Sequence, residues 1–184
     1  MSYLKFDRRL MANLDESTQR EYIRTNRKGA YCCSSIVGCN TRKYHGILVV
    51  PVPELSDNNH VLLSSLDLTI VQHGVPFNVG IHEYEGDVFS PKGHKYIREY
   101  NVDIASSTTY RVGGVVLQKE FLFCHYTNRM LLRYTLLEAH SRTTLRLSPF
   151  LAFRDVKMLT HRNDQHHGEH GHAQSGVTFC LYPG

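Results

Sequence analysis

The sequence predicts an all-β fold, a large antiparallel β-sandwich that forms a single domain over residues 1–184. Short apolar, β-branched segments follow one another at regular intervals from Gly46 onward, and turn residues separate most of them. No helical periodicity lies between these segments, which argues against a βαβ fold. Hydrophobic residues make up 41% of the chain and charged residues 21%, as in folded domains, so the composition excludes a disordered protein.

The predicted strand 61–71 contains a stretch with period two, in which Leu66, Leu68 and Ile70 alternate with polar residues. A hairpin turn is predicted at 72–76, where this strand ends. The other strands, predicted from apolar composition and flanking turn residues, cover 47–52, 79–84, 95–102, 108–112, 115–124, 129–137, 143–153 and 177–182. Turns are predicted at Gly113–Gly114 and at residues 125–128.

The predicted strand 115–124 carries Leu117, Phe121 and Phe123 on one face, which Lys119 interrupts. A half-buried strand of this kind is typical of a large antiparallel sheet.

Three segments depart from the succession of strands. The only helix predicted covers residues 15–22, with Asp15 as its cap. Residues 161–172 are polar throughout and rich in histidine, so we predict a loop there, either solvated or able to hold a metal ion through its histidines. The strand 177–182 is followed at once by Pro183 and Gly184, from which we expect the natural domain to continue past the end of this sequence.

Charge and hydropathy limit the classes of partner that the chain can have. The formal net charge is +4, but Lys and Arg are dispersed and accompany no nucleic-acid-binding motif, so we predict no nucleic-acid partner. No apolar run approaches the roughly 20 residues that cross a bilayer, and residues 1–9 lack the apolar stretch of a secretory signal. We therefore predict no membrane partner and a cytoplasmic location.

The chain has five cysteines, an odd number without a C-x-x-C pair or zinc-ribbon spacing. We predict reduced, mostly buried thiols, and neither a metal site nor a cofactor. The five are Cys32, Cys33, Cys39, Cys124 and Cys180.

The most informative stretches are residues 21–31 and 37–49. The second contains Thr41-Arg42-Lys43-Tyr44-His45-Gly46-Ile47-Leu48-Val49 and enters a predicted strand. Both resemble the opening signature of the amino-terminal domain of bacterial and archaeal glycogen debranching enzymes, the amylo-α-1,6-glucosidase family. That family has a Thr-Asn-Gly-x-Gly-Gly-Tyr turn, in which Arg27 and Ala30 replace two glycines here. Residues 84–94, 128–136 and 149–155 resemble later landmarks, so the resemblance covers roughly residues 20–184.

The resemblance implies a sandwich similar to the amino-terminal supersandwich domains of glucoamylase-like enzymes. In that family the catalytic carboxylates belong to a following barrel of paired helices, which this sequence does not contain. We therefore expect a non-catalytic module that packs against the C-terminal helical-barrel catalytic domain of the same polypeptide and helps to position an α-glucan substrate.

Four residues are candidates for substrate binding or for the domain interface: Asn26, Arg42, Tyr44 and His45. An aromatic ring and an Arg fork offer a sugar an apolar platform and several hydrogen-bond donors. The alternative is that Tyr44 and His45 are core or interface residues bonded to backbone, and that Asn26 organises its turn.

Hydrolysis with inversion needs two carboxyls about 6.5–9.5 Å apart. Glu83, Glu85 and Asp87 would lie about 7 Å apart along one strand face, so spacing alone does not exclude them, and Asp103 and Asp155 are further candidates. Carboxylates near turns usually face solvent, so we predict no catalytic residue in this chain. Arg154 and Asp155 are expected to form an ion pair that holds a strand end, with a ligand role as the alternative.

Two rival functions remain open: a stand-alone carbohydrate-binding sandwich, and a mutarotase-like sugar epimerase, which would use His and Glu as acid and base. A native gene product with a long helical continuation would favour the debranching module over the first rival. Aldose mutarotation by the purified chain would favour the second.

Overall fold

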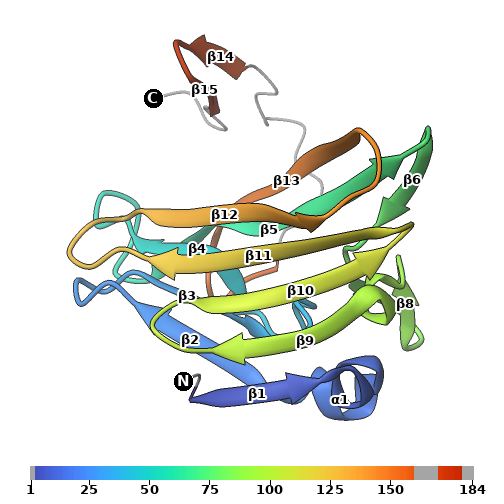
Figure 1. The fold of residues 1–184 in the computed structure, drawn as a ribbon. Helices are drawn as coiled ribbons and strands as arrows, with labels where there is room; N and C mark the ends of the chain where they lie inside the picture. Colours follow the sequence, from blue (N-terminus) through green and yellow to red (C-terminus); the bar gives the residue numbers. More distant parts are fainter. Residues whose placement is uncertain (1–2, 160–169, 180–184) are drawn as a thin grey trace.

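Two antiparallel sheets stacked face to face form the protein, as the computed structural model shows for residues 3–159 and 170–179 (Figure 1). The first sheet has the order β1 (Leu4–Asp7), β9 (Ile97–Val102), β10 (Ser106–Val112), β11 (Val115–Phe123) and β12 (Met130–Glu138). The second has the order β13 (Thr143–Asp155), β5 (Asn59–Gln72), β4 (Gly46–Pro51), β3 (Tyr31–Ser35) and β2 (Glu21–Thr25), and β6 (Val75–Asn78) pairs with β5. The prediction of an all-β sandwich is confirmed.

Several short elements lie outside the two main sheets. A hairpin of β7 (His82–Tyr84) and β8 (Val88–Ser90) is followed by the 3-10 helix η1 (Gly93–Tyr96). The helices α1 (Arg8–Ala12) and α2 (Leu14–Ser17) lie between β1 and β2, and β14 (His170–Ala173) pairs with β15 (Gly176–Phe179) as a separate hairpin. In the described part of the chain, no helix combines the length and the apolar character needed to cross a bilayer.

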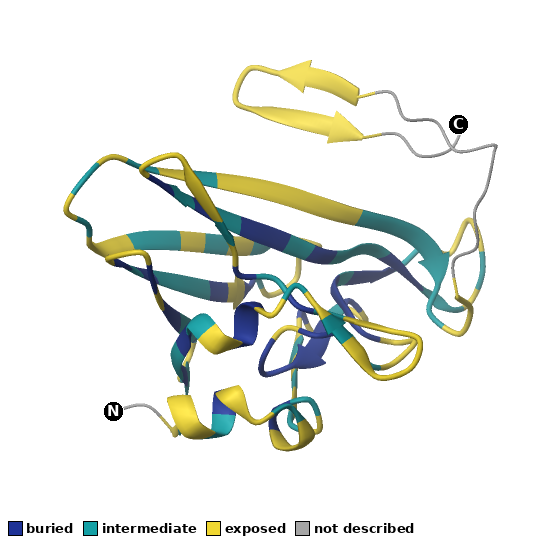
Figure 2. Cartoon of the chain, turned by 90° about the vertical axis from the view of Figure 1, so that its right-hand side faces the viewer, coloured by how far each residue is buried: buried dark blue, intermediate teal, exposed yellow. Residues whose placement is uncertain are grey.

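The core lies between the two sheets, and Figure 2 shows buried residues gathered there while the hairpins are exposed. On β11, Leu117, Phe121 and Phe123 are buried as the period-two pattern predicts, because alternate side chains of a strand share a face. They pack with buried residues of the second sheet, including Ile70 and Val50. Burial of this apolar surface is the main favourable term for the fold.

Tight turns set the register of the hairpins. Between β5 and β6, His73 and Gly74 have φ of 50° and 78°, and positive φ at both central residues is what a type I′ turn requires. The predicted turn between β10 and β11 also lies where expected. In the turn between β2 and β3, Arg27 takes the place of a family glycine and nevertheless adopts φ of 63°. The turn therefore keeps a left-handed residue there, at a steric cost of roughly 1–2 kcal/mol.

The helix prediction for residues 15–22 is wrong in extent. Helix α2 ends at Ser17, and residues 21 and 22 belong to β2. Asp15 lies inside the first turn instead of at the cap, which is Asn13. Helix α1 was not predicted; its cap is Asp7, which accepts a hydrogen bond from the Leu10 N–H at 3.0 Å. Neither helix exceeds five residues, and so short an element leaves almost no periodic signal.

Other boundaries also differ from the prediction. Residues 95–96 belong to η1, and residues 79–81 precede β7 and lie outside any strand. His170 and His172, expected in a loop, lie in β14, whereas residues 161–169 fall outside the described part of the chain. The predicted strand 177–182 is seen as Gly176–Phe179, and residues 180–182, including Cys180, also fall outside. Strands β1, β2, β3, β6 and β8 were not predicted.

Candidate functional site

The motif segment, defined as residues 40–46, connects β3 to β4 and meets one carboxylate of β2. Glu21 Oε1 lies 3.3 Å from Arg42 Nε and 3.3 Å from His45 Nε2, and Glu21 Oε2 accepts a hydrogen bond from the Tyr44 hydroxyl at 3.1 Å. Strand β3 lies between β2 and β4, so the sheet itself brings Glu21 beside the segment. Three of the four predicted site residues therefore gather around a single carboxylate.

His45 is fully buried and its ring nitrogens have distinct surroundings. The Thr41 N–H donates to His45 Nδ1 at 3.0 Å, so in the neutral ring the proton resides on Nε2, which faces Glu21. Burial lowers the pKa of His45, although the Glu21 carboxylate opposes the shift. His45 is therefore a neutral, fixed ring that supports the segment, and it is not exposed to a ligand as a free acid or base.

Glu21, Cys33 and His45 also hold their potential metal-ligand atoms within 4.8 Å of one another. A histidine that ligates through Nε2 normally donates its other ring N–H to an acceptor. Here Nδ1 instead accepts from the Thr41 N–H, which leaves no free lone pair on Nε2 of the neutral ring. Burial, with the Glu21 charge as a second cause, also raises the pKa of the Cys33 thiol to about 11. The hydrogen bonding of these residues therefore fits a group held together by the Glu21 carboxylate better than it fits a metal centre.

Asn26 lies at the opposite end of β2, about 16 Å along the strand from Glu21. It is fully buried, and its side chain makes four hydrogen bonds. Its Oδ1 accepts from the Lys28 and Ala30 N–H groups, and its Nδ2 donates to the Thr127 carbonyl and to Asn128 Oδ1. The structure therefore separates Asn26 from the other three candidates and engages its amide fully in joining two turns.

An open groove of about 470 Å³ runs between the motif segment and the β7–β8 hairpin. Arg42 and Lys43 line it on one side. The three carboxylates predicted from the 83–87 spacing, Glu83, Glu85 and Asp87, line the other side and are exposed. The structure therefore brings the motif and the acidic hairpin, about 40 residues apart in the sequence, to the same groove. Asp103 is not among the residues that line it.

Arg154 and Asp155 do not form the expected side-chain ion pair. Arg154 instead donates to the backbone carbonyls of Lys43 at 2.6 Å and Met158 at 2.7 Å, while Asp155 accepts from Asn58 Nδ2 at 2.9 Å. Adjacent residues of a strand point to opposite faces, which explains why the two charges do not meet. Arg154 thus ties β13 to the motif segment.

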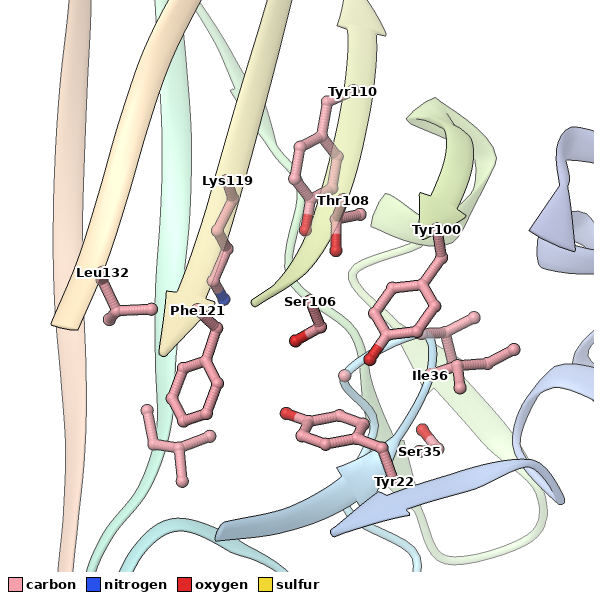
Figure 3. Close-up of a pocket in the computed structure, with 13 residues that line it drawn as sticks. Tyr22, Ser35, Ile36, Tyr100, Ser106, Thr108, Tyr110, Lys119, Phe121 and Leu132 are labelled. Carbon is pink, nitrogen blue, oxygen red and sulfur yellow. The ribbon is translucent and has the colours of Figure 1, made fainter. Parts of the chain in front are cut away.

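Two adjoining cavities of about 50 and 60 Å³ lie between the sheets around Lys119, and Figure 3 shows the first of them. The Lys119 amino group points inward among tyrosine, serine and threonine side chains (Figure 3). Burial lowers its pKa, although Asp67 opposes the shift. Each cavity has room for one or two water molecules and none for a sugar. These two cavities therefore surround a polar side chain and are too small for a sugar.

Sequence reasoning missed Glu21 and Tyr84 as members of the site. Glu21 lies in the matching stretch 21–31, but nothing in that stretch indicates that its carboxylate meets residues 42–45. Tyr84 lines the groove and is 57% exposed, a large apolar surface outside the core. The sequence signal that could have identified Tyr84 is its position between Glu83 and Glu85, two of the predicted carboxylates.

Comparisons with known proteins agree with the resemblance. The chain matches the family described as "Glycogen debranching enzyme N terminal" over residues 20–184. No curated protein and no solved structure matches it. Because the family match spans nearly the whole chain, from β2 to the last residue, the chain belongs to the glycogen debranching enzyme N-terminal family.

Proposed function

We propose that this chain is the non-catalytic N-terminal module of a glycogen debranching enzyme, an α-1,6-glucosidase of α-glucan breakdown. It supports a helical-barrel catalytic domain of the same polypeptide and helps to position the substrate. One observation carries the proposal: residues 41–46, the segment that most closely resembles the family signature, border a groove that Glu83, Glu85 and Asp87 also line.

The arrangement of the candidate acid and base groups supports a non-catalytic role. Glu83, Glu85 and Asp87 are exposed on a hairpin, and Asp155 is bound by Asn58 and by the Lys157 N–H. A general acid at neutral pH needs an enclosed site that raises its pKa. None of these carboxyls is enclosed in that way, so the chemistry is assigned to the other domain.

The mutarotase-like alternative is less well supported. His45 of the motif segment pairs with Glu21 of β2, but this histidine has no exposed surface and cannot reach a sugar. A cytoplasmic location is part of the proposal, and the reduced thiols of Cys32, Cys33 and Cys39 support it.

The test is Arg42→Ala in the full-length enzyme, assayed on limit dextrin. We expect at least a tenfold loss of kcat/KM, about 1.4 kcal/mol, with a nearly unchanged thermal midpoint because the Arg42 side chain is 53% exposed. Arg111→Ala is the matched control: its side chain is 55% exposed and pairs with Glu138 at 3.2 Å, far along the other sheet.

Three outcomes decide the question. Unchanged activity in Arg42→Ala would remove the functional role of the segment. Activity that falls only in step with the thermal midpoint would show that the motif is structural. Glucose release from limit dextrin by the isolated chain, abolished by Glu83→Gln or Asp87→Asn, would overturn the non-catalytic assignment.

A further inference from the structure

We propose that the groove between the motif segment and the β7–β8 hairpin is a binding subsite for a linear α-glucan chain, with Tyr84 as its aromatic platform. The identity of the sugar rests on the proposed function. The location of the subsite and its hairpin wall rest on the geometry described below.

The motif wall of the groove is held rigidly from beneath. Asn40 Nδ2 donates to the Ser64 carbonyl at 2.9 Å, and its Oδ1 accepts from the Ser34 hydroxyl at 2.8 Å. His45 Nδ1 holds the Thr41 N–H, and Arg154 holds the Lys43 carbonyl. Four separate contacts therefore fix this wall before any ligand arrives, which lowers the entropic cost of binding.

Arg42 is oriented by Glu21 and keeps more than half of its side-chain surface exposed. One ion contact at 3.3 Å leaves most of its five N–H donors free. Lys43 lines the same wall, and its backbone is held by Arg154. This wall thus presents exposed hydrogen-bond donors to the groove.

The hairpin wall has an anchored base and an exposed tip. At the base, His82 Nε2 lies 2.9 Å from Asp67 Oδ2, and the Gly93 N–H donates to the Gly80 carbonyl at 3.0 Å. At the tip, Tyr84 is 57% exposed and is flanked by carboxylate acceptors. An exposed tyrosine ring on a fixed hairpin offers a large amphipathic surface at low entropic cost.

The charge of the groove selects the class of ligand. Two cations, Arg42 and Lys43, face three carboxylates, Glu83, Glu85 and Asp87, so neither sign dominates. A phosphorylated or nucleic-acid ligand would meet the carboxylates, and a polycation would meet Arg42 and Lys43. Donors on one wall, acceptors on the other and an aromatic ring suit a neutral, polyhydroxylated chain.

The dimensions agree with this class. The groove measures about 470 Å³, within the range of small-molecule sites, and it is open at the surface, as binding along a chain requires. The interior cavities around Lys119 are about eight to nine times smaller.

The experiment measures binding of maltoheptaose to the purified chain by titration calorimetry. We expect Tyr84→Ala to weaken binding at least tenfold without a change in thermal midpoint. Tyr126→Ala is the matched control, since Tyr126 is 56% exposed and lies outside the groove, and we expect unchanged affinity. Cellohexaose and inorganic phosphate should bind at least tenfold more weakly than maltoheptaose.

Maltoheptaose binding that is absent, or equal in the wild type and Tyr84→Ala, overturns the subsite. Equal binding of cellohexaose overturns the assignment to α-glucan, and tighter binding of phosphate overturns the charge argument. These results are distinguishable from failure of the proposed function, because that function is tested by hydrolysis in the full-length enzyme. A chain that binds maltoheptaose while the full-length protein fails to debranch limit dextrin would leave the subsite intact.

Discussion

Replacing Asn26 with Ala tests whether this residue joins the two sheets. Its amide accepts from two N–H groups of its own turn, between β2 and β3, and donates to two oxygens of the turn between β11 and β12. At about 1 kcal/mol per hydrogen bond, with the buried Ala30 N–H left unpaired in the variant, we expect the free energy of unfolding to fall by about 3–5 kcal/mol.

The measurement is urea denaturation of the chain followed by far-UV circular dichroism. Asn101→Ala is the control, because Asn101 is half-buried and its amide donates to Glu99 alone, at 3.1 Å, so its loss should be about 1 kcal/mol or less. A decrease below about 1 kcal/mol for Asn26→Ala would refute the argument, since it would mean that the four bonds add nothing beyond what water supplies.

Two further predictions concern the interior. Lys119→Met should raise the free energy of unfolding at pH 7 by about 1–4 kcal/mol, because it removes a buried cation. Burial lowers the native pKa of Lys119, so the unfolded chain holds that proton more tightly than the folded chain does. The stability of the wild type should therefore rise with pH between the lowered native pKa and 10.5. Urea titrations at several pH values should show that this contribution is missing in Lys119→Met. Gly93→Ala would place its Cβ 2.2 Å from the Val79 carbonyl carbon and should lower the thermal midpoint by several degrees, whereas Gly176→Ala, which meets nothing within 4 Å, should not; equal midpoints would contradict so close an approach of Gly93 to the Val79 backbone.

Most of the longer strands from Gly46 onward could be predicted because their signals are local, whereas the short strands β6 and β8 were missed. Alternation on β5 and β11, and the turns at His73–Gly74 and Gly113–Gly114, depend only on neighbours in sequence. Strand β3 escaped prediction because Cys32, Cys33, Ser34 and Ser35 are small and buried together, without period two. Such a strand is recognised by its position inside the sheet and not by its composition.

The candidate site could likewise be predicted only where its signal is local in the sequence. The importance of Arg42, Tyr44 and His45 could be inferred from a contiguous motif, but their common partner, Glu21, lies on another strand. The groove depends on a further long-range contact, between the motif segment and the hairpin that carries Tyr84. Arg154 was expected to meet its neighbour Asp155, whereas strand geometry turns it toward the Lys43 carbonyl. Tertiary proximity of this kind leaves no periodic trace in a single sequence.

The pairing of β1 with β9 bears on how the chain folds during synthesis. Phe6 is opposite Tyr100, so the first strand waits for a partner made about 90 residues later. At ribosomal rates of roughly 5–20 residues per second, that wait lasts on the order of 5–20 s. Asn26 waits still longer for residues 127 and 128. Strand β1 thus leaves the ribosome without its partner, and early binding by a chaperone would protect it until β9 of the same sheet has been made.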